Sequence, residues 1–205
     1  MIDQPQDIAL IRRILRDPQE GDTIRNETAN LLTRSEVPQL ADDLIRVLEH
    51  PTERARFRSF AMQHLGVLWL QRGAKPDDPI RARLIAGLDD RHVPVRREAL
   101  LPLTRGQDTI VPARIAAILG PDGDAAQWDL ACRLVADLEL ADHLPAVRAL
   151  LTEADETIRC AALDAIARMG DTASRAEAER AAQDANPRIA AAGRRALSAL
   201  TEAKP

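Results

Sequence analysis

Residues 155–170, which read DETIRCAALDAIARMG, decide the fold of this chain. The stretch opens with an acidic turn at Asp155, has apolar residues at 158, 162, 165, 166 and 169, and stops at Gly170. Apolar residues at these intervals fall along one side of a helix that has about 3.6 residues per turn. The stretch therefore predicts a helix that is buried along one side.

The same pattern recurs along the chain. Five such helices start their apolar stripe at Ile24, Phe57, Val95, Ile158 and Ile189, which we call the anchors. Four positions after each anchor the residue is small: Thr28, Ala61, Ala99, Ala162 and Gly193. Eight positions after it the residue is Leu or Ile: Leu32, Leu65, Leu103, Ile166 and Leu197. Small residues let two helices approach closely, and the larger ones fill the shared core. A further copy fits residues 110–139, with its register ambiguous around Gln127 and Trp128, so the pattern indicates a repeat protein of about six units.

Each of these helices follows another that commonly opens with proline, as at Val37-Pro38, Asp78-Pro79, Val111-Pro112 and Leu144-Pro145. Proline is tolerated in the first turn of a helix, where the amide has no intrahelical acceptor to lose. We therefore expect helix pairs near 6–16 and 22–34, 37–49 and 52–71, 78–89 and 94–104, 110–119 and 125–139, 142–152 and 156–169, and 172–183 and 187–201. They form units at about 6–34, 35–72, 77–105, 109–139, 141–169 and 171–201 of one repeat domain that spans residues 1–205.

Local residues refine this expectation. Ser35, Asp78, Asp124 and Asn186 are the predicted helix N-caps, because short polar side chains accept hydrogen bonds from the first free amides of a helix. Pro102 falls inside the second helix of the third unit, so we predict a bend or an early end there.

The repeated combination of an acidic residue, an apolar–Arg pair, a small residue and a Leu or Ile resembles HEAT repeats. The short spacing is most similar to the HEAT-like repeats of phycobilisome-lyase type. This resemblance implies an all-α fold, a right-handed α-solenoid (α-α superhelix) of about six HEAT-like helix pairs. It also implies that the recurrent arginine bonds acidic turn residues, such as Asp90 and Asp155, in its own or an adjacent unit; these arginines are Arg25, Arg58, Arg96 and Arg159. Anion binding by the same row is the alternative. The fourth and sixth units lack the arginine.

Composition excludes several classes of partner. The net charge is -4, with 28 basic and 32 acidic residues dispersed along the chain. Such a balance gives no overall attraction to phosphate backbones or anionic membranes, so nucleic acid is an unfavoured partner. DNA-lesion binding, which one HEAT-like family performs with a basic face, is a weaker alternative, because Trp69 and Trp128 lie in apolar runs typical of core packing.

The location that we expect is cytoplasmic. The N-terminus lacks a basic segment followed by an apolar run, and no apolar stretch reaches about 18 residues. Cys132 and Cys160 lie on predicted helices without CxxC spacing, which is typical of two buried, reduced thiols.

No pattern in the sequence predicts catalysis, a metal or a cofactor. The four histidines, His50, His64, His92 and His143, lack the i, i+3 or i+4 partners of a helical metal site, so we expect solvated or capping roles. The His-Glu pairs that mark the HEAT-like di-iron hydroxylases are absent as well. A lyase-like helper of an enzyme, similar to the paired HEAT-like phycobilin lyases, is nevertheless an alternative function that the resemblance implies.

The main functional prediction is a scaffold or adaptor that binds another protein. In HEAT-like arrays the second helices line the concave side, and their exposed positions lie two, three, six and ten residues after the anchor. The predicted partner-binding residues are Phe60, Gln63, Arg97, Glu98, Leu101, Arg105, Asp129, Arg133, Asp164 and Arg168. Phe60 and Leu101 would form an apolar spot among mixed charges.

Overall fold

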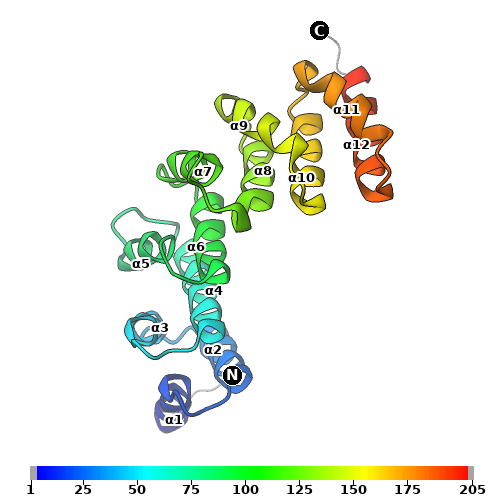
Figure 1. Ribbon diagram of the computed structural model, residues 1–205. Helices are drawn as coiled ribbons and strands as arrows, with labels where there is room; N and C mark the ends of the chain where they lie inside the picture. Colours follow the sequence, from blue (N-terminus) through cyan, green and yellow to red (C-terminus); the bar gives the residue numbers. More distant parts are fainter. Residues whose placement is uncertain (1–3, 203–205) are drawn as a thin grey trace. The chain divides into compact units, whose positions relative to one another are not determined.

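The structure, a computed structural model, describes residues 4–202, and those residues form helices and turns without a strand (Figure 1). The chain divides into two compact halves, the N-terminal half up to Val111 and the C-terminal half from Pro112. The N-terminal half contains α1 (Pro5–Arg16), α2 (Asp22–Arg34), α3 (Leu40–Glu49), α4 (Ala55–Gln71), α5 (Pro79–Gly87) and α6 (Val93–Arg105). These are the helix pairs of three repeats, as the periodicity predicts.

The C-terminal half contains the other helix pairs. Helix α7 (Val111–Leu119) begins at the boundary and is followed by a 3₁₀ turn, η1 (Ala125–Gln127), and α8 (Trp128–Asp137). The next pair is α9 (Leu144–Ala149), flanked by η2 (Ala141–His143) and η3 (Leu150–Thr152), with α10 (Glu156–Arg168). The last pair is η4 (Thr172–Ser174) with α11 (Arg175–Ala182), and α12 (Pro187–Glu202). The all-α repeat prediction is confirmed, with 3₁₀ turns in or beside the predicted helices 125–139, 142–152 and 172–183.

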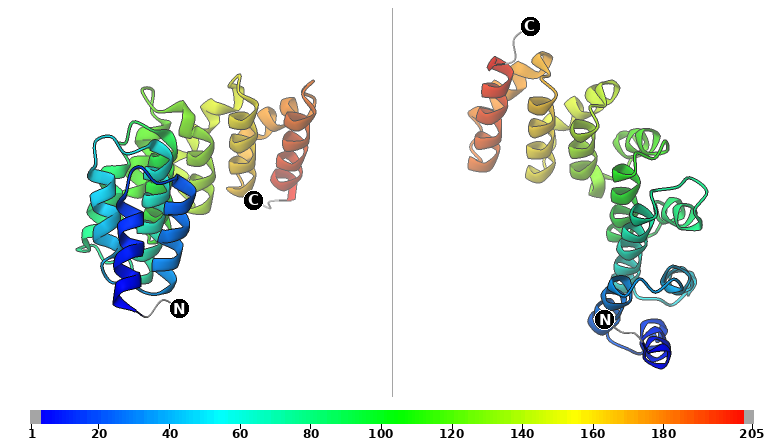
Figure 2. Two further views of the ribbon diagram at one scale, coloured as in Figure 1. Left: turned by 90° about the horizontal axis from the view of Figure 1, so that it is seen from below. Right: turned by 180° about the vertical axis from the view of Figure 1, so that it is seen from behind.

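Each half has two layers of helices. In the N-terminal half the first helices α1, α3 and α5 form one layer and the second helices α2, α4 and α6 the other (Figures 1 and 2). In the C-terminal half α8, α10 and α12 lie side by side, with α9 and α11 on one side of them. Within each half, the apolar stripe on the second helix of a pair lies mainly between the two layers.

The burial of the stripe follows the predicted pattern closely. The small residues Ala61, Ala99 and Ala162 are fully buried, as are the larger residues eight positions after the anchors in α2, α4, α6 and α10. Gly193 lies so close to α11 that a Cβ added to it would be 2.4 Å from the backbone nitrogen of Ala182. Three stripe residues depart from the pattern: Ile24 is 54% exposed, Ile158 is half-buried, and Leu197 is half-buried because α12 turns Ala196 and Leu200 into the core instead.

Helix ends confirm three of the four predicted caps. The side chains of Asp78, Asp124 and Asn186 accept hydrogen bonds from the amides of Ile80, Ala126 and Arg188. Ser35 is a correction: it is the C-cap of α2, where its own amide donates to the carbonyl of Leu31. The chain then turns at Glu36, which has a φ of 50°, and α3 begins only at Leu40.

The early end predicted at Pro102 is wrong. Helix α6 continues through this residue to Arg105, and the amide of Gly106 donates to the Pro102 carbonyl. The proline ring is buried against Gly66 of α4, where an added Cβ would lie 2.6 Å from the ring Cγ. The glycine therefore provides the space for the proline, so that α4 and α6 pack closely at this point.

Three of the recurrent arginines, Arg25, Arg58 and Arg159, connect their repeat to the following one, as the resemblance implies. Arg25 donates from Nε to the carbonyl of Leu15 at 2.8 Å, and its two Nη atoms bond the Glu53 carboxylate at 2.9 and 2.6 Å. Arg58 repeats both contacts, with the Leu48 carbonyl at 2.7 Å and with the Asp90 carboxylate. We call these contacts the second-helix bridges.

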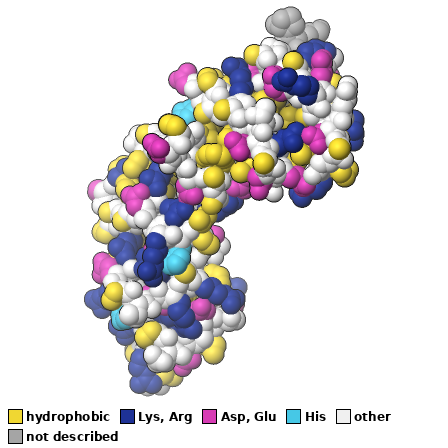
Figure 3. All heavy atoms as spheres, viewed as in Figure 1, with side chains coloured by type: hydrophobic (Ala, Val, Ile, Leu, Met, Phe, Trp, Pro, Cys, Tyr) yellow, Lys and Arg dark blue, Asp and Glu magenta, His cyan; other side chains and the backbone are white. Residues whose placement is uncertain are grey.

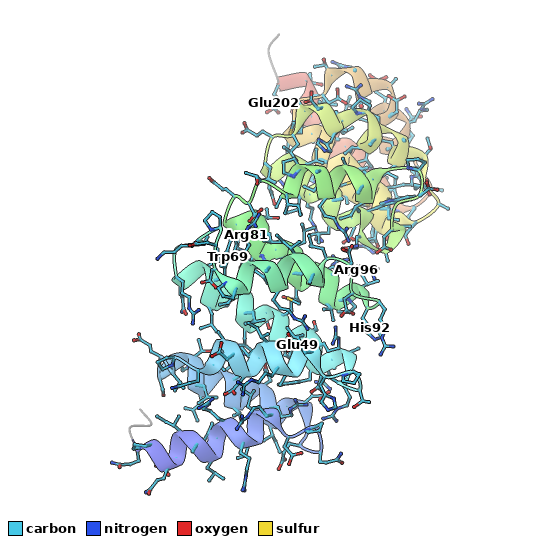
Figure 4. The ribbon with its side chains drawn as sticks, turned by 90° about the vertical axis from the view of Figure 1, so that its left-hand side faces the viewer. Glu49, Trp69, Arg81, His92, Arg96 and Glu202 are labelled. Carbon is cyan, nitrogen blue, oxygen red and sulfur yellow. The ribbon has the colours of Figure 1, made fainter. Side chains whose placement is uncertain are left out.

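The same row continues in the other repeats. Arg159 bonds Asp184 at 2.7 Å, and Arg96 donates to the backbone carbonyl of Asp90 at 2.7 Å near the start of α6 (Figure 4). Asp155 is a correction, since its carboxylate does not accept an arginine. It caps α10 instead, by accepting from the amides of Thr157 and Ile158.

A second row of bridges starts from the first helices, and the sequence pattern did not predict it. Arg12 bonds Asp43 at 2.6 and 3.1 Å, Arg81 bonds Asp108 at 2.5 and 3.0 Å, and Arg148 bonds Asp171 at 2.8 and 2.5 Å. In each case two guanidinium nitrogens meet two carboxylate oxygens, the strong fork-like geometry of arginine. These first-helix bridges hold the outer layer of one repeat to the start of the next.

The bridges also move the pKa values of their carboxylates. Burial alone would raise the pKa of Glu53, but the hydrogen bonds and charge of Arg25 outweigh it, so the pKa is below its ordinary value. The hydrogen bonds from Arg81 and Arg148 lower the pKa values of Asp108 and Asp171 in the same direction. All three carboxylates are therefore ionised at neutral pH.

We predict that Arg25→Met destabilises the protein by about 3–5 kcal/mol, because it leaves the carboxylate of Glu53 buried without its cation. The side chains of Arg25 and Glu53 are 0% and 2% exposed. Urea unfolding at neutral pH measures the loss. The matched control is Arg168→Met, which removes a bridge to Asp137 with both side chains 50% exposed and should cost less than about 1 kcal/mol. Equal losses in the two variants would contradict the assignment.

Candidate functional site

The second helices of the N-terminal half present a regular surface. Residues three, six and ten positions after each anchor lie on the same side of α2, α4 and α6, and these helices pack next to each other. They form three rows across the helices, which we call the α2–α4–α6 face: Glu27, Phe60 and Glu98; Asn30, Gln63 and Leu101; Arg34, Val67 and Arg105.

The apolar part of this face differs from the predicted one. Phe60 and Leu101 are half-buried, and the guanidinium carbon of Arg56 lies 5.7 Å from the centre of the Phe60 ring. The most exposed apolar side chain on the face is Val67, which is 39% exposed. Val67 is absent from the predicted binding residues, although the rule of ten positions after the anchor reaches it from Phe57.

The first row of the face is acidic and the third is basic. Arg34 and Arg105 lie in the last turns of α2 and α6, where a positive charge complements the helix dipole. Glu27 and Glu98 lie near the middle of the same helices. The structure shows no ion pair or hydrogen bond from these four side chains to another residue within 4–202. They are therefore available to a ligand.

Glu98 has an unusual environment among these charges. It is half-buried, and this burial raises the pKa of its carboxyl group, although Arg105 and Arg97 act to lower it. Arg97 is also half-buried, whereas Arg105 is exposed. A cationic group placed beside Glu98 would stabilise the ionised carboxylate more than at a fully hydrated site.

We predict that Glu98→Gln raises the melting temperature slightly at pH 7, since the substitution removes a charge that burial disfavours. A raised carboxyl pKa means that the cost is present above that pKa and disappears below the ordinary value of 4.5. The difference between variant and wild type should therefore vanish near pH 4. Thermal unfolding by circular dichroism at both pH values checks this, with Glu49→Gln on α3 (Figure 4) as the control. A lower melting temperature at pH 7 would refute the assignment.

His64 lies beneath the face and corrects the prediction of a solvated or capping histidine. It is 6% exposed, and its Nε2 lies 3.0 Å from Oδ1 of Asn26 on the neighbouring helix α2. Burial lowers the pKa of the imidazole, although the charge of Glu27 acts to raise it. The histidine is therefore neutral at pH 7 and joins α2 to α4.

We predict that the protein loses stability as the pH falls below about 6.5, because the unfolded chain then protonates His64 while the folded protein resists it. The variant His64→Gln keeps a hydrogen-bonding side chain that does not titrate. Its stability should change less between pH 7 and pH 5.5 than that of the wild type. Guanidinium unfolding at the two pH values measures this difference, and the same pH dependence in both proteins would contradict it.

The predicted binding residues of the C-terminal half form ion pairs within the chain. Arg133 bonds Asp129 at 2.9 Å within α8, Arg168 of α10 bonds Asp137 of α8 at 2.6 Å, and Asp164 accepts from Arg195 of α12 at 3.3 Å. Asp129, Arg133, Asp164 and Arg168 therefore already have intramolecular partners. The structure brings the other six predicted residues together in the N-terminal half.

An open groove of about 530 Å³ lies at the C-terminal ends of α2 and α4. Its walls include Thr33, Arg34, Leu68, Gln71 and Arg72, so it begins at the basic row of the α2–α4–α6 face. The groove lengthens the α2–α4–α6 face by about one turn at the C-terminal ends of α2 and α4, which a bound chain could also contact.

Other features give no sign of a catalytic or metal centre. Within the described residues 4–202, no three His, Cys, Asp or Glu side chains are grouped so that they could hold a metal ion. Cys132 is buried, and burial raises the pKa of its thiol to about 12, so it is not a nucleophile at neutral pH. Cys160 is only partly buried, which corrects the expectation for that residue.

The surface as a whole carries both signs of charge. On the side shown in Figure 3, basic and acidic side chains are interspersed with apolar ones. Trp69 is fully buried and donates to the Lys75 carbonyl, and Trp128 is half-buried and donates to that of Ile118. Both tryptophans therefore belong to packing, as expected. In the described part of the chain, every helix is too short or too polar to cross a bilayer.

Comparisons with solved structures place the fold among helical repeat proteins. A designed armadillo repeat protein in complex with the peptide (KR)4 has a TM-score of 0.61 and 16% identity, over 95% of this chain and 92% of that chain. Computationally designed armadillo repeat proteins for modular peptide recognition match with a TM-score of 0.59 and 17% identity, over 96% and 94%. A further designed armadillo repeat protein matches with a TM-score of 0.58 and 16% identity, over 98% and 95%.

These likenesses establish the helical-repeat solenoid fold. No protein-family model matches the sequence, and no curated protein matches it either. The particular similarity to phycobilisome-lyase repeats stays a prediction.

Proposed function

We propose that the protein is a binding scaffold, and that its α2–α4–α6 face holds a peptide segment of another protein. The observation that carries this proposal is the pattern of the face itself. The exposed apolar residue Val67 lies between Arg34 and Arg105 in the basic row, and Glu27 and Glu98 lie in the acidic row at the opposite end. The designed relatives in fold support it, since two of them are described as peptide-binding or peptide-recognising proteins.

The order of the rows suggests the chemistry of the bound segment. A cationic side chain would meet Glu27 and Glu98, apolar side chains would cover Leu101 and Val67, and an anionic side chain would meet the basic row. Each exposed charge pair contributes little, about 1 kcal/mol or less, so the complementarity would set orientation more than affinity. The bound segment would therefore be amphipathic, with a basic end and an acidic end.

Five of the six predicted residues of the N-terminal half belong to the rows of the proposed binding face: Phe60, Gln63, Glu98, Leu101 and Arg105. Arg97, two positions after its anchor, lies outside these rows. The four of the C-terminal half contribute less, because binding would first have to break their intramolecular ion pairs. The proposed partner is therefore another protein, whose identity is not assigned.

The two alternative functions stay predictions. The mixed charge of the α2–α4–α6 face supports DNA-lesion binding poorly, since gripping a phosphate backbone requires several adjacent cations without carboxylates between them. No contact of the described residues favours a lyase-like helper over a plain scaffold.

The test uses a fluorescein-labelled peptide of twelve residues with lysines at one end, leucines and valines in the centre and glutamates at the other, made in both chain directions. Fluorescence anisotropy at low salt should show that one direction binds the protein about tenfold more tightly than peptides with lysines alone or glutamates alone around the same centre.

Charge reversal then locates the site. Glu98→Lys and Arg105→Glu should each weaken binding of the preferred peptide about fivefold, because each turns an attraction into a repulsion. The matched controls on the other layer, Glu49→Lys and Arg46→Glu on α3, should leave the affinity unchanged. Binding that all four substitutions affect equally, or no binding of either peptide direction, would overturn the proposal.

A further inference from the structure

Three of the four large exposed apolar side chains in the described chain belong to the first repeat. Leu10 on α1 is 50% exposed, and Ile24 and Leu31 on α2 are 54% and 39% exposed. The fourth, Val67, is part of the α2–α4–α6 face. A cluster of exposed apolar side chains is notable, because such a patch is typical of a surface that another protein segment covers.

Ile24 occupies the anchor position, which the preceding repeat covers elsewhere in this half. Its equivalents Phe57 and Val95 are both 0% exposed. The guanidinium carbon of Arg25, from the repeat before, lies 3.6 Å from the centre of the Phe57 ring. The side of α2 that carries Ile24 is therefore a repeat-stacking side without a preceding helix pair in the described chain.

Leu31, seven positions after the anchor, leads to the same conclusion. Its equivalents are His64, which bonds Asn26 of the preceding α2, and Pro102, which packs on Gly66 of the preceding α4. Both equivalents are buried by the repeat before them. Ile24 and Leu31 are thus two turns apart on the same open side of α2.

Leu10 has a buried equivalent as well. Arg25 and Arg58 bond the carbonyls of Leu15 and Leu48, so these two leucines correspond, and five positions before them are Leu10 and Asp43. Asp43 is 0% exposed and accepts Arg12 from the preceding repeat. We call Leu10, Ile24 and Leu31 the open end.

The charged residues at the open end indicate which group would bind there. In both rows of bridges the arginine comes from one repeat and the carboxylate from the next. Glu20, five positions before Arg25, corresponds to Glu53, five positions before Arg58. Within residues 4–202 the carboxylate of Glu20 has no partner, so the open end carries an acceptor without its arginine.

The repeat of α11 and α12 has a different surface on the side that faces a following repeat elsewhere. Asn26 and Gly66, which face the next repeat, lie two and nine positions after their anchors. The equivalents in α12 are Ala191 and Ser198, and Ser198 bonds Glu202 in a polar surface. At the position of the bridging arginine α12 has Ala190, so the second-helix bridge cannot be repeated there.

We propose that the open end is an interface between two copies of this chain, related by a two-fold axis. Antiparallel packing of α2 on α2 of the second copy would bring Ile24 against Leu31 of that copy. The same arrangement would bring Glu20 opposite Arg34 of the second copy, since both pairs of residues are centred close to position 27. The second copy would supply the arginine that a preceding repeat supplies elsewhere.

This arrangement fits the observations better than head-to-tail stacking. A head-to-tail contact would place polar α12, with Ala190, on an apolar surface that needs an arginine. A two-fold contact is self-complementary: Ile24 of each copy meets Leu31 of the other, and Glu20 of each copy meets Arg34 of the other. Arg34 is exposed and has no partner among the described residues.

Sedimentation velocity of the full chain tests the proposal. The wild type should be dimeric at micromolar concentrations, and Ile24→Asp with Leu31→Gln should raise the dissociation constant at least a hundredfold, because four buried apolar side chains are lost per dimer. The matched control is Val67→Asp, which replaces an apolar residue as exposed as Leu31 on the α2–α4–α6 face and should leave the dimer intact. Far-ultraviolet circular dichroism verifies that each variant is folded.

A charge exchange tests the two-fold geometry. Glu20→Lys and Arg34→Glu should each weaken the dimer, and the double variant should restore it, because the ion pair is then reversed between copies. If the wild type is monomeric, or if Val67→Asp weakens association as much as the open-end variant, the proposal is overturned. A dimer that the double variant fails to restore overturns the antiparallel pairing of α2.

Discussion

A buried arginine that joins three segments of chain is the interaction on which the stacking of the first two repeats depends. Arg25 bonds the last turn of α1 through the Leu15 carbonyl and the following repeat through Glu53, and its guanidinium also covers the ring of Phe57. One side chain therefore sets the distance within a helix pair and the stacking between pairs. The first-helix bridges add a second attachment, so that the first and second repeats, and the fifth and sixth, are held on both layers.

Much of this fold follows from periodicity, because the residues that decide it are close in sequence. The anchor, the small residue four positions later and the large residue eight positions later lie on one helix and need no knowledge of the neighbours. Pro102 shows the limit of such reasoning. Whether a proline ends a helix depends on what it packs against, and Gly66 is far away in sequence.

The bridges show the same limit. The recurrent arginine is visible in the sequence, but its carboxylate partner is not, because the turns differ in length: Arg25 and Glu53 are 28 residues apart, Arg58 and Asp90 are 32, and Arg159 and Asp184 are 25. The positions of the surface residues could be predicted in part. Helical position predicts that Phe60 faces outward, whereas its partial burial depends on Arg56, and the ion pairs of α8, α10 and α12 depend on how three helices pack.

The alanine at position 190 has a consequence for how a chain of this kind can lengthen. Duplication of the segment that encodes an interior repeat, such as the one with Arg58, would create a new junction with a complete guanidinium contact. Duplication of the last segment would create a junction without it. A duplicated copy of an interior repeat would therefore stack with the guanidinium contact intact, whereas a duplicated copy of the repeat with Ala190 would stack without it.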